Sequence, residues 1–337
     1  MKTFKKINFQ DKFFIAGSTG MVGRAVFKVL KKNGYGNENL GGSIFTPKRN
    51  NLNLLNENEV KIWFERYKPS VVILAAAKVG GILANSSKPY NFIFENLKIQ
   101  NNIIESAFKN GVKRLLFLGS SCIYPKLCEQ PIKEEYLLNG PLETTNEWYA
   151  IAKIAGLKLC QALRNQYDFD AISLMPTNLY GPNDKYDLKN SHVIPGLIRK
   201  FINAKINSLN SVTCWGTGEP LREFMHVDDL ASAILFCLEY WCPDDSDAPL
   251  DDNGIPLNFL NVGTGSDITI KDLSQLISKI SGFKGEILWD KSKPNGTPQK
   301  LLNINKIKSL GWSPSIKLED GLKETISDFK NNFSLNI

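Results

Sequence analysis

Tyr149 and Lys153 stand four residues apart in the stretch NEWYAIAKIAG, which we expect to form a helix. Residues at positions i and i+4 share one helix face, so the phenol and the ammonium should be neighbours. A free tyrosine has a pKa of roughly 10 and is a poor acid–base group at neutral pH. A nearby ammonium favours the phenolate and should lower that pKa. This spacing alone occurs often by chance, but here it follows a glycine-rich start by about 130 residues and comes after a strand ending in GSSC. That order predicts an acid–base centre at Tyr149.

Three glycines, Gly17, Gly20 and Gly23, follow an apolar strand and open a predicted helix. The tight turn, the approach of the backbone to a pyrophosphate and the packing of helix on strand each require a residue without a side chain. The free N–H groups at the helix N-terminus can then bind phosphates. The spacing is G-x-x-G-x-x-G rather than the commoner G-x-G-x-x-G. It predicts a dinucleotide site formed by Gly17, Ser18, Thr19, Gly20, Met21, Val22 and Gly23.

The segment after the second predicted strand indicates which dinucleotide binds. An NAD site usually carries Asp or Glu about 20 residues beyond the glycines. Here no acidic residue occurs between Glu38 and Glu57, and the strand is followed by Lys48 and Arg49. A guanidinium binds a 2′-phosphate, which a carboxylate would repel. We therefore expect NADPH, with a solvated turn as the alternative reading of Lys48 and Arg49.

The elements that position these groups alternate between short apolar runs and helix-length segments, which is typical of βαβ units around a parallel sheet. We expect strands at 12–16, 43–46, 70–75, 114–119 and 170–176, and helices at 22–33, 57–67, 91–110 and 147–166. Beyond a long loop after Pro176, we expect a helix at 193–204, a strand at 212–215, a helix at 227–240, a strand at 258–262 and a helix from about 268.

The predicted fold class is α/β. A Rossmann-type doubly wound parallel sheet should be formed by residues 1–180, with 227–262 returning to it. Residues 181–226 and 263–332 should form a smaller C-terminal α/β lobe that binds substrate.

Composition excludes several classes of protein. The chain has 337 residues, of which 42% are hydrophobic and 22% charged, as in ordinary globular proteins. No run of about 18 apolar residues and no signal peptide is present, so we expect no membrane association and a cytoplasmic location. Six cysteines without a C-x-x-C pair, and only two histidines, argue against a disulfide framework or a metal site. The net charge of +7 comes with no nucleic-acid reader motif, so we expect no nucleic-acid partner.

Further motifs occur in a fixed order along the chain. They are AAAKVGG (75–81), LGSSCIYPK (118–126), YAIAKIAG (149–156), MPTNLYGP (175–182), SHVIPGL (191–197), WGTGEPLREFMHVDD (215–229) and NVGTG (261–265). With the glycine turn, they resemble the extended short-chain dehydrogenase/reductase superfamily and, within it, the GDP-L-fucose synthase family. The resemblance implies conversion of GDP-4-keto-6-deoxy-D-mannose to GDP-L-fucose, by epimerisation at carbons 3 and 5 and reduction of the carbon-4 ketone by NADPH.

The resemblance also implies roles for individual residues. Ser120 and Tyr149 would hydrogen-bond the carbon-4 oxygen and stabilise the enolate that forms when a neighbouring carbon loses a proton. Cys122 would be the base and His192 the acid of epimerisation. Lys153 would tune Tyr149 and hold the cofactor ribose.

Each assignment has an alternative. Cys122 beside an apolar strand is ordinarily an inert buried thiol. Ser121 could take the place of Ser120. His226 lies in a stretch shared broadly in the superfamily and is read as structural, which leaves His192 as the candidate acid.

Contacts beyond the catalytic group follow from the same resemblance. Cofactor contacts are implied at Ala75, Ala76, Ser120, Lys153, Pro176, Asn178, Leu179 and His192. Substrate contacts are implied at Lys200, Trp215, Arg222 and Asn295. Two positions depart from the family pattern, because Asn295 stands where an acidic residue is usual and Thr19 stands where arginine is frequent. A homodimer formed through the helices at 91–110 and 148–166 is also implied.

Several other functions remain open. A 4,6-dehydratase typically has an Asp–Glu pair after its catalytic Ser or Thr, whereas Ser121 and Cys122 follow Ser120. A UDP-sugar 4-epimerase holds NAD, which the basic pair after the second strand disfavours. A GDP-mannose reductase without epimerisation would need neither Cys122 nor His192. A cofactor-sensing protein without catalysis is the alternative from another class.

Overall fold

The computed structural model describes residues 5–187, 191–293 and 295–333. Six strands form the central sheet in the order β2-β1-β3-β4-β5-β9, and every neighbouring pair is parallel. These strands are β1 (Lys12–Ala16), β2 (Ser43–Phe45), β3 (Val71–Leu74), β4 (Arg114–Leu118), β5 (Ala171–Pro176) and β9 (Phe259–Val262). The strand order reverses between β1 and β3, so a crevice is expected at their carboxyl ends. The predicted doubly wound α/β fold is confirmed.

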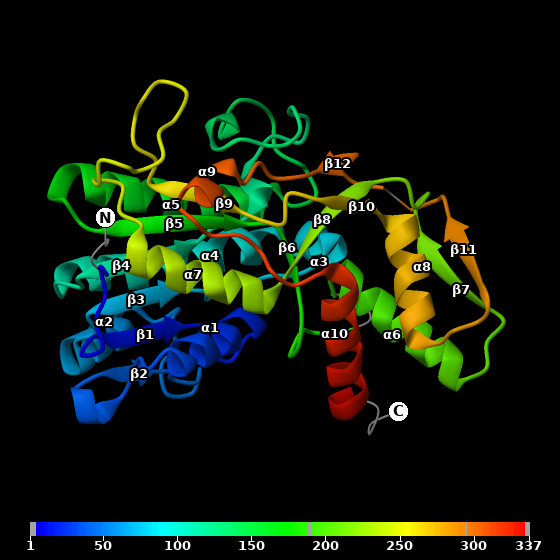
Figure 1. Cartoon of the computed structure of the whole chain (residues 1–337), viewed down its shortest axis with the longest axis horizontal. Helices are drawn as coiled ribbons and strands as arrows, with labels where there is room; N and C mark the ends of the chain where they lie inside the picture. The colour runs from blue at the N-terminus through cyan, green and yellow to red at the C-terminus, as the bar shows by residue number, and fades with distance from the viewer. Residues whose placement is uncertain (1–4, 188–190, 294, 334–337) are drawn as a thin grey trace.

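Helices cover both faces of this sheet (Figure 1). One face carries α1 (Met21–Lys32) and α7 (Val227–Tyr240), which pack on each other. The other face carries α2 (Glu57–Tyr67), α4 (Pro89–Lys109) and α5 (Glu147–Tyr167). Because both faces are covered, the inner strands are buried along nearly their whole length and mostly apolar rather than alternating.

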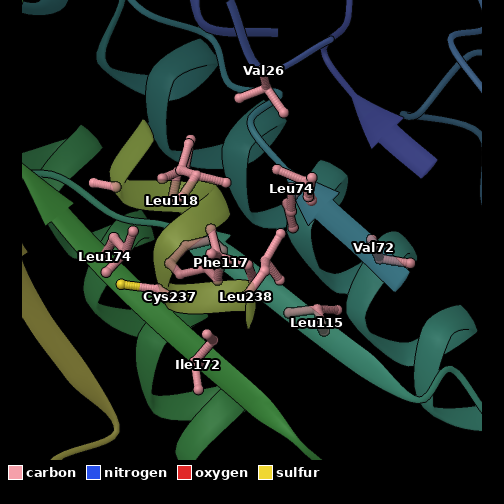
Figure 2. Packing of buried hydrophobic residues seen from close by; sticks show 14 of the residues in the cluster. Val26, Val72, Leu74, Leu115, Phe117, Leu118, Ile172, Leu174, Cys237 and Leu238 are labelled. Carbon is pink, nitrogen blue, oxygen red and sulfur yellow. The ribbon is translucent and has the colours of Figure 1, made fainter. Parts of the chain in front are cut away.

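The core lies between the sheet and these helices. Figure 2 shows Phe117 of β4 and Leu174 of β5 beside Cys237 and Leu238 of α7, and all four are fully buried. Burying a side chain of this size stabilises the fold by roughly 1.5–3 kcal/mol. The sheet that ends at the crevice is therefore rigidly held.

A second, smaller lobe lies beside the carboxyl ends of the strands (Figure 1). Its strands are β6 (Asn178–Tyr180), β8 (Leu221–His226), β10 (Asp267–Thr269) and β12 (Gln299–Lys300), which form one sheet, and β7 (Ser211–Trp215) and β11 (Glu286–Asp290), which form another. Its helices are α6 (Val193–Ile206), α8 (Ile270–Ser281) and α10 (Leu318–Phe333). They share a separate core that includes Ile198, Phe201, Ile277, Leu322 and Phe329.

The structure differs from the sequence prediction in a few short elements. The long loop expected after Pro176 contains β6, which pairs with β8. Three-residue strands are too short to show a periodic pattern. A short helix, α3 (Ile82–Ser87), was not predicted, nor was α9 (Asn305–Ser309). Ile307 of α9 packs into the first core, although sequence assigned 263–332 to the second lobe. The lobe boundaries therefore stay a prediction.

Among the described residues, no helix is long and apolar enough to span a bilayer. The same part of the chain holds no cluster of three or more His, Cys, Asp or Glu side chains that could bind a metal ion.

Candidate active site

One cavity of about 1210 Å³ lies where the carboxyl ends of the strands face the second lobe. The predicted site residues that line it are Gly17, Ser18, Thr19, Gly20, Met21, Val22, Gly23, Arg49, Ala75, Ala76, Ser120, Cys122, Tyr149, Lys153, Pro176, Asn178, Leu179, His192, Lys200, Trp215, Arg222 and Asn295. Lys48 is not among the described residues that line the cavity, and its side chain is exposed. Residues scattered over most of the sequence thus meet in one place.

The glycine turn at the end of β1 has the properties of a phosphate cradle. Gly17 has φ of 92°, which L side chains rarely adopt. A Cβ on Gly23 would lie 2.3 Å from the Gly17 carbonyl oxygen, so α1 packs directly on the turn. Gly20 caps α1 without a side chain, which leaves the N–H groups of the first turn open to the cavity. This turn can accept a pyrophosphate.

Two further observations fit a dinucleotide. The Ser18 hydroxyl oxygen is buried and has no hydrogen-bond partner among the described residues, so a ligand group would satisfy it. Arg49 reaches the cavity and is the guanidinium available to a 2′-phosphate. Thr19 also lines the cavity, and its carbonyl oxygen accepts a hydrogen bond from Arg24 Nε at 3.1 Å.

Lys153 lies beneath Tyr149 on α5 and is almost fully buried. Its Nζ donates to the Leu118 carbonyl oxygen at 2.6 Å and lies 5.8 Å from the centre of the Tyr149 ring. Burial lowers the pKa of Lys153 to about 7. The lysine is thus held in place by the end of β4 and changes protonation near neutral pH.

The expected lowering of the Tyr149 pKa by the lysine is wrong for this geometry. Burial raises the pKa of Tyr149, negative charge at Cys122 raises it further, and a hydrogen bond with Ser120 opposes them. Lys153 is not among the groups that shift the pKa of Tyr149. Tyr149 is therefore held as a protonated donor.

The structure distinguishes Ser120 from Ser121. Ser120 caps a short 3₁₀ turn, η2 (Ser121–Ile123), and its hydroxyl oxygen accepts from the Cys122 N–H at 3.2 Å. Its interaction with Tyr149 links it to the acid–base centre. Ser121 also borders the cavity but is 2% exposed. The geometry favours Ser120 as the partner of Tyr149.

Cys122 is half-buried on the wall of the cavity. Its sulfur accepts from Asn146 Nδ2 at 3.3 Å and from Lys300 Nζ at 3.5 Å. Sequence reasoning missed both donors. Asn146 stands three residues before Tyr149, where it precedes α5, so its spacing could have suggested it. Lys300 is far along the chain and gave no signal of this contact.

The two histidines occupy different environments. His192 precedes α6 and lines the cavity, where desolvation and the positive charge of Lys185 lower the pKa of its imidazole. His226 is 1% exposed, and its Nδ1 accepts from the Asp228 N–H at 3.2 Å at the start of α7. His226 is also outside the described lining of the cavity. The His226 side chain caps a helix, whereas the His192 side chain makes no capping hydrogen bond and lines the cavity.

Trp215 presents a large aromatic surface to the cavity, with 54% of it exposed. Lys200 Nζ lies 5.8 Å and Lys293 Nζ 6.0 Å from its ring centre. The wall of the second lobe therefore combines an aromatic face with positive charge, which suits a nucleotide diphosphate.

Arg222 and Asn295 are joined to each other in this wall. Arg222 Nη2 donates to the Asn295 carbonyl oxygen at 3.4 Å. The Asn295 side-chain oxygen accepts from the Thr217 N–H at 2.9 Å, so it supports the turn that follows Trp215. Asn295 consequently has a structural contact that an aspartate could also make.

Comparison with known proteins gives a consistent result. Residues 13–245 match the NAD dependent epimerase/dehydratase family. GDP-L-fucose synthase 1 of Arabidopsis thaliana is 49% identical over 321 residues, which cover 95% of this chain and 94% of the relative. A GDP-6-OMe-4-keto-L-xylo-heptose reductase from C. jejuni superposes with a TM-score of 0.88 at 35% identity, covering 96% of this chain and 99% of that one. A GDP-L-fucose synthetase from Naegleria fowleri bound to NADP has a TM-score of 0.84 at 26% identity, covering 99% and 98%.

Proposed function

We propose, from the premise that this chain belongs to the NAD dependent epimerase/dehydratase family and within it to the GDP-L-fucose synthases, that the cavity is the active site of an NADP-dependent epimerase/reductase. The protein makes GDP-L-fucose from GDP-4-keto-6-deoxy-D-mannose. The observation that carries this function is the convergence of Ser120, Cys122, Tyr149 and His192 on one cavity beside the glycine turn.

NADP(H) is the cofactor, and the residues of this chain fit it. We assign the pyrophosphate to the turn from Gly17 to Gly23, and the 2′-phosphate to Arg49. The predicted contact of Lys48 with the cofactor stays a prediction, because Lys48 does not line the cavity. NADPH supplies the hydride when bound, and the residues around it orient substrate and move protons.

The proton chemistry can be assigned to named atoms. The Cys122 sulfur takes a proton from a ring carbon beside the ketone, and the electron pair of the broken C–H bond moves onto the carbon-4 oxygen. Ser120 and Tyr149 hydrogen-bond that oxygen and stabilise its charge. His192 returns a proton to carbon from another side of the cavity. Tyr149, whose pKa is raised, finally donates its proton to the carbon-4 oxygen during reduction.

The direct test is to incubate the purified protein with GDP-4-keto-6-deoxy-D-mannose and NADPH and to identify the sugar by NMR. GDP-L-fucose supports reduction and both inversions together. A product that keeps the D-configuration contradicts the epimerase assignment. No turnover contradicts the substrate assignment.

A reductase without epimerisation is the second candidate, because a 4-keto-heptose reductase superposes closely on this chain. Heavy water separates the two functions. We expect deuterium at carbons 3 and 5 with the unmodified protein, and incorporation reduced on the order of 100-fold in C122S, in line with loss of a general base. Nucleotide binding should be retained in C122S, which serves as the folding control. Unchanged incorporation would remove Cys122 from the mechanism.

We also propose that the protein is a homodimer. Tyr90 and Phe94 of α4 are 66% and 45% exposed, and their rings stack at 5.1 Å. Trp148 and Ile151 of α5 are 38% and 40% exposed, and α5 packs beside α4. Apolar side chains gathered on neighbouring helices favour a protein partner. Light scattering should give twice the chain mass, and a monomer at micromolar concentration would contradict the dimer. A cytoplasmic location stays a prediction from sequence.

A further inference from the structure

The Cys122 sulfur lies between two donors, Lys300 Nζ at 3.5 Å and Asn146 Nδ2 at 3.3 Å. We propose that Lys300 is the positioning residue that keeps Cys122 as a thiolate, so that its sulfur can act as a base. The inference deepens the proposed function and rests on it. It assigns a role to a residue for which the sequence predicted none.

The backbone around Lys300 is fixed on two sides, so the contact is built into the fold. Lys300 pairs with Arg222 across the parallel β12–β8 ladder. The next residues are also held, since Leu301 N–H donates to the Gln130 side chain at 2.8 Å and Leu302 N–H to the Glu223 carboxylate at 3.0 Å. Glu223 belongs to β8 of the second lobe and Gln130 to the segment that follows Cys122. Lys300 therefore belongs to the second lobe but contacts Cys122 of the first lobe at the cavity.

The charged groups nearest the sulfur are mainly positive. Lys300 approaches from β12, and the positive charge of Arg222 on β8 interacts with Cys122 as well. From α5, Asn146 donates a neutral hydrogen bond. The negative charge of Glu143 interacts with Arg222 and partly offsets its positive charge. Glu143 is itself paired with Lys126 at 2.9 Å. An opposite charge within about 4–6 Å favours the ionised form by roughly 10-fold or more.

The charge on Cys122 also affects Tyr149. Negative charge on the sulfur raises the pKa of Tyr149 on α5. A thiolate at Cys122 and a protonated phenol at Tyr149 are therefore mutually supporting. This is the starting state that epimerisation requires, because the sulfur must accept a proton while the phenol donates a hydrogen bond to the carbon-4 oxygen. The proton that the sulfur takes up returns to solvent.

Alkylation by iodoacetamide tests the proposal without any sugar nucleotide. The thiolate sulfur forms a bond to the reagent's carbon and iodide leaves, so the rate reports the fraction of thiolate. The rate at Cys122 is measured by mass spectrometry of its peptide between pH 6 and 9, in the full chain. K300M removes the charge, K300R keeps it, and K279M removes the charge of an exposed lysine on α8 as a matched control. Cys242, half-buried elsewhere in the first lobe, is the internal reference.

At pH 7 we expect the Cys122 rate to fall on the order of 10-fold in K300M and its pH profile to move to higher pH, because an ion partner is lost. In K300R and K279M the Cys122 rate should stay within about 3-fold of that of the unmodified protein. The alkylation rate of Cys242 should be the same in all variants. An unchanged profile in K300M overturns the proposal. So does an equal loss in K300M and K300R, because that outcome reports packing rather than charge.

Failure of the inference can be separated from failure of the proposed function. If the product is GDP-L-fucose but K300M alkylates like the unmodified protein, only the role of Lys300 is wrong. If K300M shows the expected shift but no GDP-L-fucose forms, the ion pair is supported and the substrate assignment fails. Unfolding curves for K300M and K300R, which should match, exclude a general folding defect.

Discussion

The two walls of the cavity are built in different ways. On the sheet side, Lys153 is held by one short contact to the end of β4, and Gly17 and Gly23 lie in a turn whose atoms leave no room for a methyl group. On the side of the second lobe, Trp215 is largely exposed and Asn295 lies on a connecting segment. The sheet side is thus a rigid frame, and the other side is an assembly of long side chains from separate segments.

Substitutions on the two sides of the cavity should therefore have different effects, on chemistry at one side and on binding at the other. Groups on the sheet side are fixed by regular elements whose packing extends into the main core. Their replacement should reduce the rate of reaction or the stability of the fold. Trp215, Arg222 and Asn295 on the second lobe contact other groups of that lobe, so their replacement should mainly alter substrate affinity.

Tyr149→Phe should have the largest effect, a loss of kcat for reduction on the order of 10³-fold, because the protonated donor is removed. NADPH binding should be nearly unchanged. Absorbance of NADPH under saturating substrate measures the rate. Y167F, at an exposed tyrosine on the same helix, is the matched control and should react normally. Near-normal turnover of Y149F would show that the acid–base centre is elsewhere.

Two glycines of the same turn should respond differently to alanine. A Cβ at Gly20 would have only the Gly17 carbonyl oxygen nearby, at 3.5 Å, so G20A should fold normally but weaken NADPH binding roughly 10–100-fold by blocking the pyrophosphate. A Cβ at Gly23 would lie 2.3 Å from that oxygen, so G23A should also lose about 1–3 kcal/mol of stability. Calorimetric titration and thermal melting measure the two effects. Equal melting temperatures for both variants would contradict the packing argument.

Lys153 should make the free energy of unfolding depend on pH. Its folded pKa of about 7 lies below that of an unfolded lysine, so between these values the unfolded chain binds one more proton. Stability should therefore rise with pH from about 7.5 to 9.5, with Lys153 adding up to about 1.4 kcal/mol per pH unit. K153M should flatten that slope in urea titrations. An identical slope in both proteins would mean that the buried lysine stays charged.

Trp215→Ala tests the opposite wall. We expect KM for the sugar nucleotide to rise about 10-fold through loss of an aromatic contact, with kcat within about 2-fold. The melting temperature should not change, since the side chain is 54% exposed. Initial rates over a range of substrate concentrations separate the two constants. A fall in kcat equal to that of Y149F would erase the proposed difference between the walls.

Asn295 should give the smallest effect. N295D keeps an oxygen that can accept from the Thr217 N–H, so KM should change by less than about 3-fold. N295A removes that acceptor and should cost about 1 kcal/mol of stability. Initial-rate kinetics measure the change in KM, and thermal melting measures the change in stability. A large rise in KM for N295D alone would indicate that charge at this position governs substrate binding.

Much of the sheet side could be predicted from the sequence because its signals are local. The strand, glycine turn and helix from Lys12 to Lys32 follow from apolar periodicity and from residues only three apart. The spacing of Tyr149 and Lys153 likewise places both on one helix face. The elements missed there and in the second lobe were short, such as β6, because three residues carry no period.

The tertiary structure decided what depends on segments that are distant in sequence. It reversed the expected direction of the Tyr149 pKa, because burial depends on everything that surrounds the ring. It left Lys48 outside the cavity while Arg49 borders it. It also brought Lys300 to Cys122, 178 positions away in sequence, through the pairing of β12 with β8. Sequence determined which groups the protein carries and their local order, whereas contact, desolvation and charge balance depend on three-dimensional packing that no local pattern encodes.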